Sequence, residues 1–201
     1  MDRDNGLQLR SSRQYILFHK PYDVLSQFTP DVPGQQTLAD YGFPAEVYAA
    51  GRLDKDSEGL LLLTDDGPFI KRILDPKFGH ERTYLAQVEG IPTADALAKF
   101  RKGLIIGAEK TLPAEVTLLL EPPELPERSV PIRVRKSIPT SWLEVKLIEG
   151  KNRQVRRMTS AIGFPTLRLL RIAIGKLSLG NLEPGKWRNL TPEEQQIVKA
   201  L

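Results

Sequence analysis

The sequence has no cysteine and only two histidines, His19 and His80, among its 201 residues. Without thiols the chain forms no disulfide, holds no zinc through thiolates and has no cysteine nucleophile. Two histidines also disfavour a metal site built from several imidazoles. A chain without cysteine is typical of a reducing compartment.

Long apolar runs are absent as well. No stretch approaches the roughly 20 apolar residues of a membrane-spanning helix. Residues 1–14 are polar and slightly basic, and they lack the apolar segment of a signal peptide. We therefore expect a soluble cytoplasmic protein with a flexible basic arm over 1–14.

Charge is present but unevenly distributed. The net charge is +4, and the segment 151–176 holds seven lysines and arginines and no acid. A basic stripe of this kind favours a polyanionic partner such as a nucleic acid. The most acidic motif lies in the first half of the chain instead, at 54–66.

Short strands and short helices alternate along the chain, which predicts an α+β fold. Period-two alternation and buried apolar runs indicate strands, whereas Pro, Thr and Gly punctuation indicates helix ends. We expect the run 60–64 to be a strand buried on both faces, and 130–136 to pair with 141–150. The other expected strands are 15–21, 47–51, 82–90, 114–121, 166–175 and short ones in 176–187, and the expected helices are 67–76, 93–103, 153–163 and one starting at Thr191.

The segment GRLDKDSEGLLLLTD (51–65) contains the acid spacing of a calcium loop, with Asp54 at its first position and Asp65 at its twelfth. A calcium loop needs flanking helices and a usable ligand at position nine, which here is Leu62. Calcium is therefore disfavoured. Asp56, Asp65 and Asp66 are interpreted as acids of a solvated turn, whereas Asp54 follows a strand end, where a catalytic carboxylate is held rigidly.

The same segment, GRLDKDSEGLLLLTDDG, resembles the signature of the pseudouridine synthases, in which the aspartate of G-R-L-D is catalytic. Further segments resemble the RsuA/RluE branch of these enzymes in the same order along the chain. They are HKPYDVLSQ (19–27), HERTYLAQV (80–88), EGKNRQVRRM (149–158) and LLRIAIG (169–175). The resemblance covers about 15–188. Only about 14 residues precede the first strand, so it is closest to short RluE-like members without an S4-type RNA-binding domain.

This resemblance implies a bent, mixed, mostly antiparallel sheet in two subdomains, flanked by helices, with a basic cleft between them. It implies one catalytic domain over 15–201, whose subdomains meet near the proline-rich segment 121–127. It also implies an isomerase without cofactor or metal that converts one uridine of large-subunit (23S) ribosomal RNA to pseudouridine. The expected partner is an RNA stem-loop, with no DNA and no membrane, and the expected working form is a monomer.

The resemblance also assigns roles to residues. Asp54 is the nucleophile or the base, Tyr84 stacks on the target base, and Arg156 pairs with Asp54 and keeps it ionised. Asp54 either attacks the ribose carbon or takes the C2′ proton, and both routes stay open. The expected RNA-binding residues are Arg52, Arg153, Arg157, Leu169 and Arg171.

Three alternatives belong to other classes of protein. A non-catalytic RNA-binding protein would explain the basic stripe but not the G-R-L-D segment. A calcium-dependent structural protein would lose thermal stability when a chelator is added. A glycoside hydrolase would need a second, protonated carboxylate, for which Glu58 is the nearby candidate.

Overall fold

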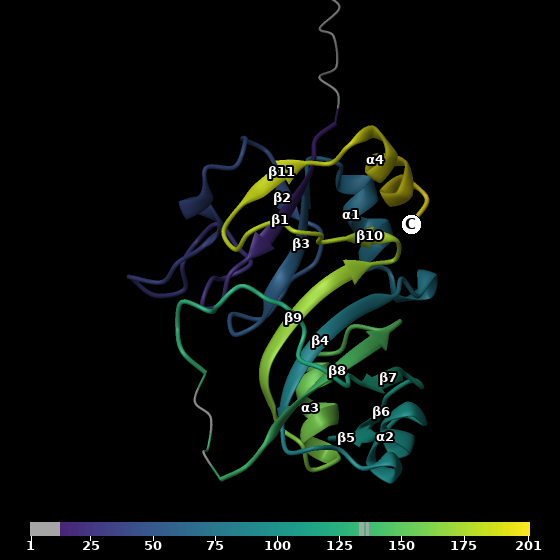
Figure 1. Ribbon diagram of the computed structural model, residues 1–201. Helices are drawn as coiled ribbons and strands as arrows, with labels where there is room; N and C mark the ends of the chain where they lie inside the picture. Colours follow the sequence, from purple (N-terminus) through teal and green to yellow (C-terminus); the bar gives the residue numbers. More distant parts are fainter. Residues whose placement is uncertain (1–12, 133–134, 136) are drawn as a thin grey trace, which may run out of the picture.

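A computed structural model describes residues 13–132, 135 and 137–201 of the chain. Its main feature is a curved nine-stranded sheet with the strand order β11-β1-β3-β9-β4-β8-β7, to which β2 and β10 add at β3 and β9 (Figure 1). Every pairing is antiparallel except that of β3 with β9. The expected α+β class with a mostly antiparallel sheet is thus confirmed.

The elements are short. The strands of the main sheet are β1 (Tyr15–Lys20), β2 (Tyr48–Ala49), β3 (Glu58–Thr64), β4 (Arg82–Glu89), β7 (Glu115–Leu118), β8 (Thr140–Leu147), β9 (Thr166–Ile174), β10 (Leu177–Ser178) and β11 (Trp187–Asn189). A separate hairpin pairs β5 (Ile105–Ile106) with β6 (Glu109–Lys110). The helices are α1 (Gly67–Leu74), α2 (Ala94–Arg101), α3 (Gln154–Ala161) and α4 (Pro192–Lys199), with 3-10 turns at Leu38–Tyr41 and Pro76–Phe78.

Strands β1 and β3 form the centre of one half of the molecule. Every residue of both strands is buried, as expected for the run 60–64. Leu60 and Leu62 pack on one face of the sheet with Phe69 of α1 and Val198 of α4. Leu61 packs on the opposite face with the aromatic residues that follow β1. A strand covered on both faces needs no alternation of polar and apolar side chains, which explains its continuous leucines.

The other half is built on β4, β8 and β9. Phe100 of α2 and Met158 of α3 pack against Leu143 and Val145 of β8 in a second core. Thr93 caps α2 through its hydroxyl, and Thr191 opens α4 with a full capping box, both as predicted. The predicted helices 67–76, 93–103 and 153–163 are confirmed with ends that differ by one or two residues.

The two halves join where β3 runs parallel to β9. Only two residue pairs make this contact, Glu58 with Leu170 and Gly59 with Arg171. Beside it, Arg168 donates Nε and Nη2 to the two carboxylate oxygens of Glu58 at 3.0 and 2.8 Å, and both side chains are buried. Glu58 is therefore engaged in a structural ion pair.

One predicted strand is wrong. In the segment 130–136, residues 130–132 and 135 lie outside any strand, and 133, 134 and 136 lie outside the described residues. The expected partner β8 instead pairs with β7 and β4 on its two edges. Pro131 lacks a backbone N–H donor, which disfavours a strand at that place. The subdomain boundary near 121–127 stays a prediction, and residues 1–12 of the expected arm lie outside the described part.

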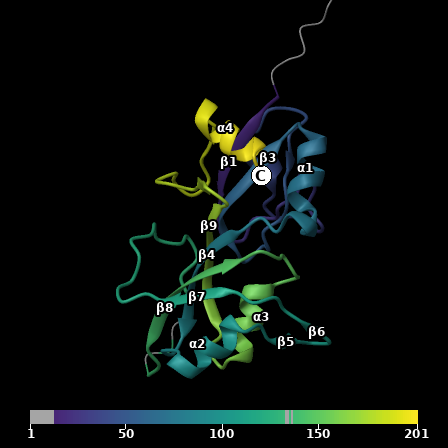
Figure 2. The same cartoon turned by 90° about the vertical axis from the view of Figure 1, so that its right-hand side faces the viewer.

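The molecule has two differently built sides, seen right and left in Figure 2. Helices α1 and α3 lie on one side, here called the pocket face. The proline-rich segment 121–127 and the turns after β10 lie on the other side, here called the rear face. Among the described residues, no helix is both long and apolar enough to cross a membrane.

Candidate active site

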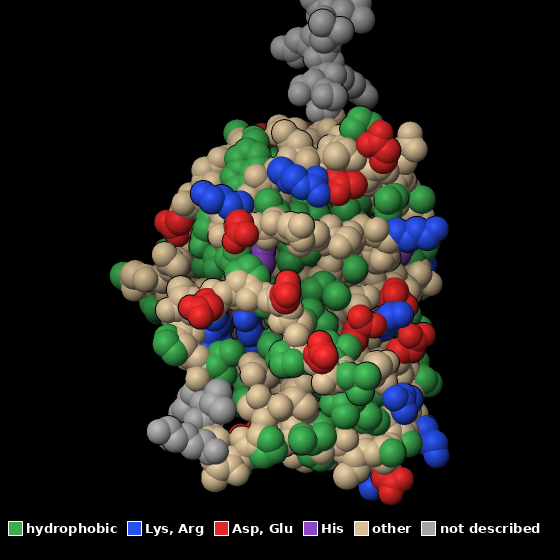
Figure 3. Space-filling model, viewed as in Figure 1, with side chains coloured by type: hydrophobic (Ala, Val, Ile, Leu, Met, Phe, Trp, Pro, Cys, Tyr) green, Lys and Arg blue, Asp and Glu red, His purple; other side chains and the backbone are tan. Residues whose placement is uncertain are grey.

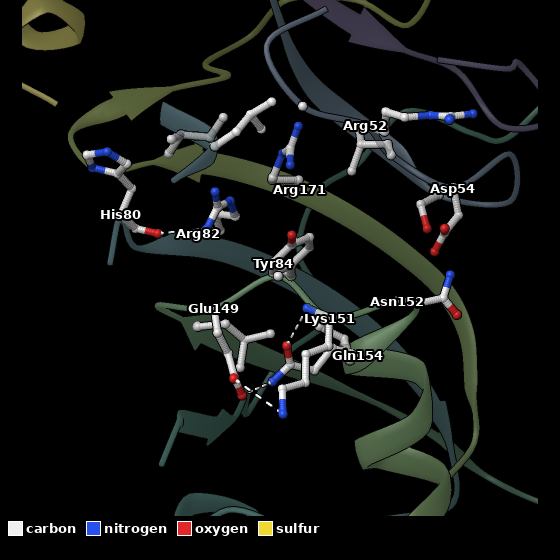
Figure 4. Close-up of a pocket in the computed structure, with 18 of the residues that line it drawn as sticks. Arg52, Asp54, His80, Arg82, Tyr84, Glu149, Lys151, Asn152, Gln154 and Arg171 are labelled. Carbon is white, nitrogen blue, oxygen red and sulfur yellow. Dashed lines mark hydrogen bonds and ion pairs between the residues drawn. The ribbon is translucent and has the colours of Figure 1, made fainter. Parts of the chain in front are cut away.

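A pocket of about 590 Å³ opens on the pocket face, between the end of α1 and the start of α3 (Figure 4). Both halves of the molecule contribute side chains to it. Six lysines or arginines and three carboxylates line it, so its walls carry excess positive charge. Six of the eight expected site residues line this pocket, namely Arg52, Asp54, Tyr84, Arg153, Leu169 and Arg171.

Asp54 is held by a hydrogen-bonded loop after β2. Ser26 donates its hydroxyl to the Leu53 carbonyl at 2.8 Å, and the same oxygen accepts from the Leu53 N–H at 3.1 Å. Ser57 N–H donates to the Asp54 carbonyl at 3.0 Å. The Asp54 side chain is one third exposed and its Oδ2 lies 3.6 Å from Nη1 of Arg153. The backbone around this carboxylate is fixed while its oxygens stay accessible.

Asp56, and not Asp54, is the main partner of the arginines of α3. Arg153 donates both terminal nitrogens to Asp56 at 2.8 and 2.7 Å. Arg156 donates Nη2 to the Asp56 carbonyl at 2.5 Å, and its Nε lies 3.4 Å from the carboxylate. No ion pair joins Arg156 to Asp54 within the described residues, so the predicted pairing differs from the structure. The interpretation of Asp56 as a solvated turn acid is wrong. It is also wrong for Asp66, which is 6% exposed and caps α1 by accepting a hydrogen bond from the Phe69 N–H at 3.1 Å.

These contacts also set the charge of Asp56. Its partial burial works to raise the pKa of the carboxyl. The hydrogen bonds from Arg153 and the positive charges of Arg156 and Arg153 outweigh that effect, so the pKa lies below the usual value. An ionised Asp56 therefore ties the loop that carries Asp54 to the first turn of α3.

Asp56→Asn is expected to destabilise the fold by about 1–2 kcal/mol, because the charge-assisted bonds from Arg153 and the ion pair with Arg156 are lost at a partly exposed site. Asp54→Asn is the matched control, since Asp54 makes only one long ion pair, and its effect is expected to stay within about 0.5 kcal/mol. Urea unfolding followed by circular dichroism measures both. Equal stability of the two variants would contradict the role given to Asp56.

Tyr84 and Leu169 form the apolar part of the pocket. Tyr84 is half-buried on β4, next to an irregularity in its pairing with β9, and packs against the cores of both halves. Leu169 is 5% exposed and belongs to the core of the second half. Figure 4 shows the Tyr84 ring near the centre of the pocket, with Asp54 to one side. The ring offers a face on which a planar group stacks.

Arg171 and Arg82 lie in the same pocket but are largely buried. Arg171 donates Nε to the Leu60 carbonyl at 2.8 Å, across the contact of β3 with β9. Arg82 donates to the carbonyls of His80 and Ile73 at 3.1 and 3.3 Å. Both guanidinium groups thus hold backbone segments of the pocket wall in place.

The remaining two arginines lie on its periphery. Arg52 is exposed and donates Nη2 to the side-chain oxygen of Gln27 at 2.8 Å. Arg157 is exposed on α3, does not line the pocket, and donates Nη2 to the Ile106 carbonyl at 2.8 Å. Arg52 thus lies at the edge of the pocket, whereas Arg157 lies on the surface against the β5–β6 hairpin.

Lys20 is a buried cation that the sequence analysis did not single out. Its side chain is fully buried, and Nζ donates to the carbonyls of Pro21, Val24 and Lys55 at 2.9, 2.7 and 3.4 Å. Because Lys55 follows Asp54 directly, Lys20 ties β1 to the loop that carries Asp54. Burial lowers the pKa of Lys20 to about 7.

Lys20 is expected to make stability depend on pH. Below about pH 7 the folded and unfolded chains both hold its proton. Between about pH 7 and pH 10.5 only the unfolded chain holds it, so the free energy of unfolding rises with pH, by at most about 1.4 kcal/mol per unit. Urea unfolding from pH 6 to pH 9 measures this rise relative to Lys20→Met. A wild-type-minus-variant difference that stays flat over that range would contradict the assignment.

The calcium interpretation gains no support from the geometry. The acidic segment leads into strand β3 rather than a helix, and Leu62 is buried in the core. Within 13–132, 135 and 137–201, no group of three or more acidic, histidine or cysteine side chains converges on a possible metal position.

Three further features of the site were not predicted from the sequence. The Asp56 network had a signal, since Arg153 and Arg156 stand three residues apart on one face of a predicted helix. The clamp of Ser26 on Leu53 had none, because it joins residues 27 positions apart. A lower wall made of Glu149, Lys151 and Gln154, which hydrogen-bond to one another, was also not foreseen (Figure 4).

Comparisons with known proteins cover most of the chain. The family model "RNA pseudouridylate synthase" matches residues 14–161. The chain is 53% identical over 174 residues to ribosomal large subunit pseudouridine synthase E of Xanthomonas campestris pv. campestris, covering 86% of this chain and 93% of that protein. It is 38% identical over 200 residues to ribosomal large subunit pseudouridine synthase B of Bacillus subtilis, covering 98% and 76%.

A solved structure supports the fold. The crystal structure of a pseudouridylate synthase superimposes with a TM-score of 0.75 at 28% identity, covering 93% of this chain and 73% of that chain. The similarity of fold therefore extends over both halves of the sheet.

Proposed function

The chain belongs to the RNA pseudouridylate synthase family, and on that premise we propose that it isomerises a specific uridine of large-subunit (23S) ribosomal RNA to pseudouridine. The family inferred from the sequence motifs is confirmed by these matches. The observation that carries the proposal for this pocket is the accessible Asp54 carboxylate on a fixed loop, beside a half-buried tyrosine ring.

The reaction breaks the bond between N1 of uracil and C1′ of the ribose and forms a bond between C5 and C1′. N1 gains a proton and C5 loses one, so product and substrate are isomers and no oxidant is consumed. Asp54 is the catalytic carboxylate of this reaction. It attacks C1′ and later leaves, as the nucleophile of a retaining glycosidase does, or it removes the C2′ proton.

Tyr84 stacks on the uracil and Leu169 supports the opposite side of the base pocket. A base stacked within RNA cannot reach Asp54, so the uridine is flipped into the pocket at a cost of a few kcal/mol. Contacts of Arg52, Arg153 and Arg157 with phosphates supply that free energy. Arg156 and Arg171 hold the pocket walls, and Arg156 approaches Asp54 when Asp56 releases it.

The proposed RNA substrate and cellular location are based on the similar proteins. Several similar proteins are named for large-subunit ribosomal RNA, which makes an RNA stem-loop of that molecule the proposed partner. A ribosomal RNA substrate makes the cytoplasm the proposed location. One chain holds all the residues proposed for the reaction, so a monomer suffices.

Tritium release tests the function. Large-subunit RNA transcribed with uridine labelled at C5 is incubated with the protein in buffer without any nucleotide. Because C5 loses its hydrogen when it bonds to C1′ of the ribose, one equivalent of tritium per RNA is expected in the solvent. Stable binding without tritium release, from both the naked RNA and assembly intermediates, would favour the non-catalytic RNA-binding protein.

Tyr84→Phe separates stacking from proton transfer. The phenyl ring keeps the stacking face, so the affinity for RNA is expected to stay within about twofold. If the phenol also moves a proton, turnover falls by about 10²- to 10⁴-fold. Filter binding and tritium release measure the two quantities. Normal turnover would exclude proton transfer by the phenol, and a loss of RNA affinity would contradict stacking as the role of the ring.

A further inference from the structure

A second pocket lies on the rear face of the sheet, away from Asp54. It has a volume of about 280 Å³ and is formed by β1, β9, the turn after β10 and the proline-rich segment. Arg168 fixes that segment by donating Nη2 to the Pro126 carbonyl at 3.0 Å. The walls are mainly aliphatic, from Leu125, Pro126, Leu170, Ile172, Leu179 and Leu182.

His19 provides a buried polar group among the aliphatic walls of this pocket. Its side chain lines the pocket and is 2% exposed. Nδ1 lies 2.6 Å from the Leu182 carbonyl, and because a carbonyl only accepts, Nδ1 carries a proton. Burial lowers the pKa of His19, so the ring is neutral and Nε2 is a bare acceptor. Nε2 has no hydrogen-bond partner in the described part of the chain.

The rim of the pocket is acidic. Glu124 and Glu183 line it and are exposed, and Glu121 and Glu127 stand exposed on the same segment. None of these four carboxylates has an ion-pair partner among the described residues. Figure 3 views this face and shows acidic side chains across its middle, where the segment runs in Figure 1.

These observations define the chemistry of a ligand. His19 Nε2 and the rim carboxylates can only accept hydrogen bonds, whereas Ser178 and Asn181 of the lining can both donate and accept, so the site favours a ligand that donates. The carboxylates favour a cation, and the aliphatic walls favour a methylene stem. A guanidinium group offers five donors in one plane, which suits an acceptor inside the pocket together with carboxylates at its rim. An RNA phosphate has neither donors nor the right charge.

We propose that the rear pocket binds an arginine side chain of a basic protein segment, so that the protein holds RNA on one face and a basic protein on the other. Proteins that themselves bind RNA are rich in such segments, which makes them the class of partner that fits. The proposal stands independently of the reaction at Asp54.

The test uses the full chain and the pentapeptide acetyl-Gly-Gly-Arg-Gly-Gly-amide. Its matched control carries citrulline, which has the same shape without the charge. The ¹⁵N chemical shift of His19 Nε2 reports binding directly, and with only two histidines in the chain, His80→Gln assigns the signal. A saturable shift with the arginine peptide, and none with the citrulline peptide, is expected.

Variants that remove negative charge from the pocket rim provide a second test with the same peptide. Glu124→Gln combined with Glu183→Gln is expected to weaken peptide binding by about fivefold, because two exposed ion pairs are removed. Glu46→Gln, an exposed acid elsewhere, is the control and leaves binding unchanged. Tritium release from naked RNA stays at the wild-type rate in both the rim double variant and Glu46→Gln.

Several results would overturn the proposal. They are the absence of a saturable shift, an equal response to the citrulline peptide, and binding that is indifferent to Glu124 and Glu183. A shift of His19 Nε2 caused by RNA would also overturn it, by making the rear pocket an RNA contact.

Discussion

Asp54→Asn is expected to lower turnover by at least about a thousandfold, as the loss of a catalytic group that acts on the reacting atoms does. Asparagine has the same shape but neither attacks C1′ nor accepts the C2′ proton as a carboxylate does. Affinity for RNA is expected to stay near that of the wild type, because Asp54 repels phosphates rather than binding them. Tritium release and filter binding measure the two effects.

The matched control is Asp65→Asn. Asp65 belongs to the same acidic segment but lies outside the pocket, where it accepts a hydrogen bond from the Gln14 N–H at 2.9 Å. The turnover of the Asp65→Asn variant is expected to remain within about twofold of the wild type, as for most surface substitutions. Activity of Asp54→Asn within tenfold of the wild type would remove Asp54 from the chemistry altogether.

Gly59→Ala is expected to destabilise the protein by about 4 kcal/mol or to prevent folding. Gly59 has φ of 101°, a backbone conformation that other residues rarely adopt. An added Cβ would overlap the Arg171 carbonyl oxygen and lie 2.8 Å from the Arg171 nitrogen, and both atoms belong to backbone. This is the place where β3 meets β9, so the substitution forces apart the strands that join the two halves.

Gly67→Ala tests whether replacing any glycine by alanine would destabilise the protein as much as Gly59→Ala does. Gly67 opens α1 at an ordinary φ, with no atom within 4 Å of an added Cβ. Its stability is expected to stay within about 1 kcal/mol of the wild type, since alanine is the better helix former. The comparison is made by urea unfolding. If Gly59→Ala is as stable as the wild type, the backbones of β3 and β9 can move apart to accommodate a Cβ, and the expected clash is contradicted.

The sequence predicted individual elements well because their signals are local. Pro68, Thr93 and Thr191 mark helix starts, and the four leucines mark a strand buried on both faces. Strand pairing was less predictable. The alternating segment 130–136 looked like a neighbour of β8, but both edges of that strand are taken by β4 and β7, which the sequence pattern alone does not reveal.

The site was predictable as a set of residues but not as a set of contacts. Motif order brought Asp54, Tyr84 and Leu169 to one pocket, as the structure has them. The partner of Arg156 was predicted incorrectly because Asp54 and Asp56 are both within reach of the same helix turn. Only the path of the loop, fixed by Ser26 and Lys20, decides that Asp56 faces the arginines while Asp54 faces the pocket.

The central claim is that the Asp54 pocket isomerises one uridine of large-subunit ribosomal RNA. Its most direct test is carbodiimide mapping by primer extension on the transcribed RNA after incubation with the wild type or Asp54→Asn. If Asp54 is the catalytic group, one new reverse-transcription stop appears with the wild type and none with the variant. The same stop with both proteins, or no stop with either on naked RNA and on assembly intermediates alike, would contradict it.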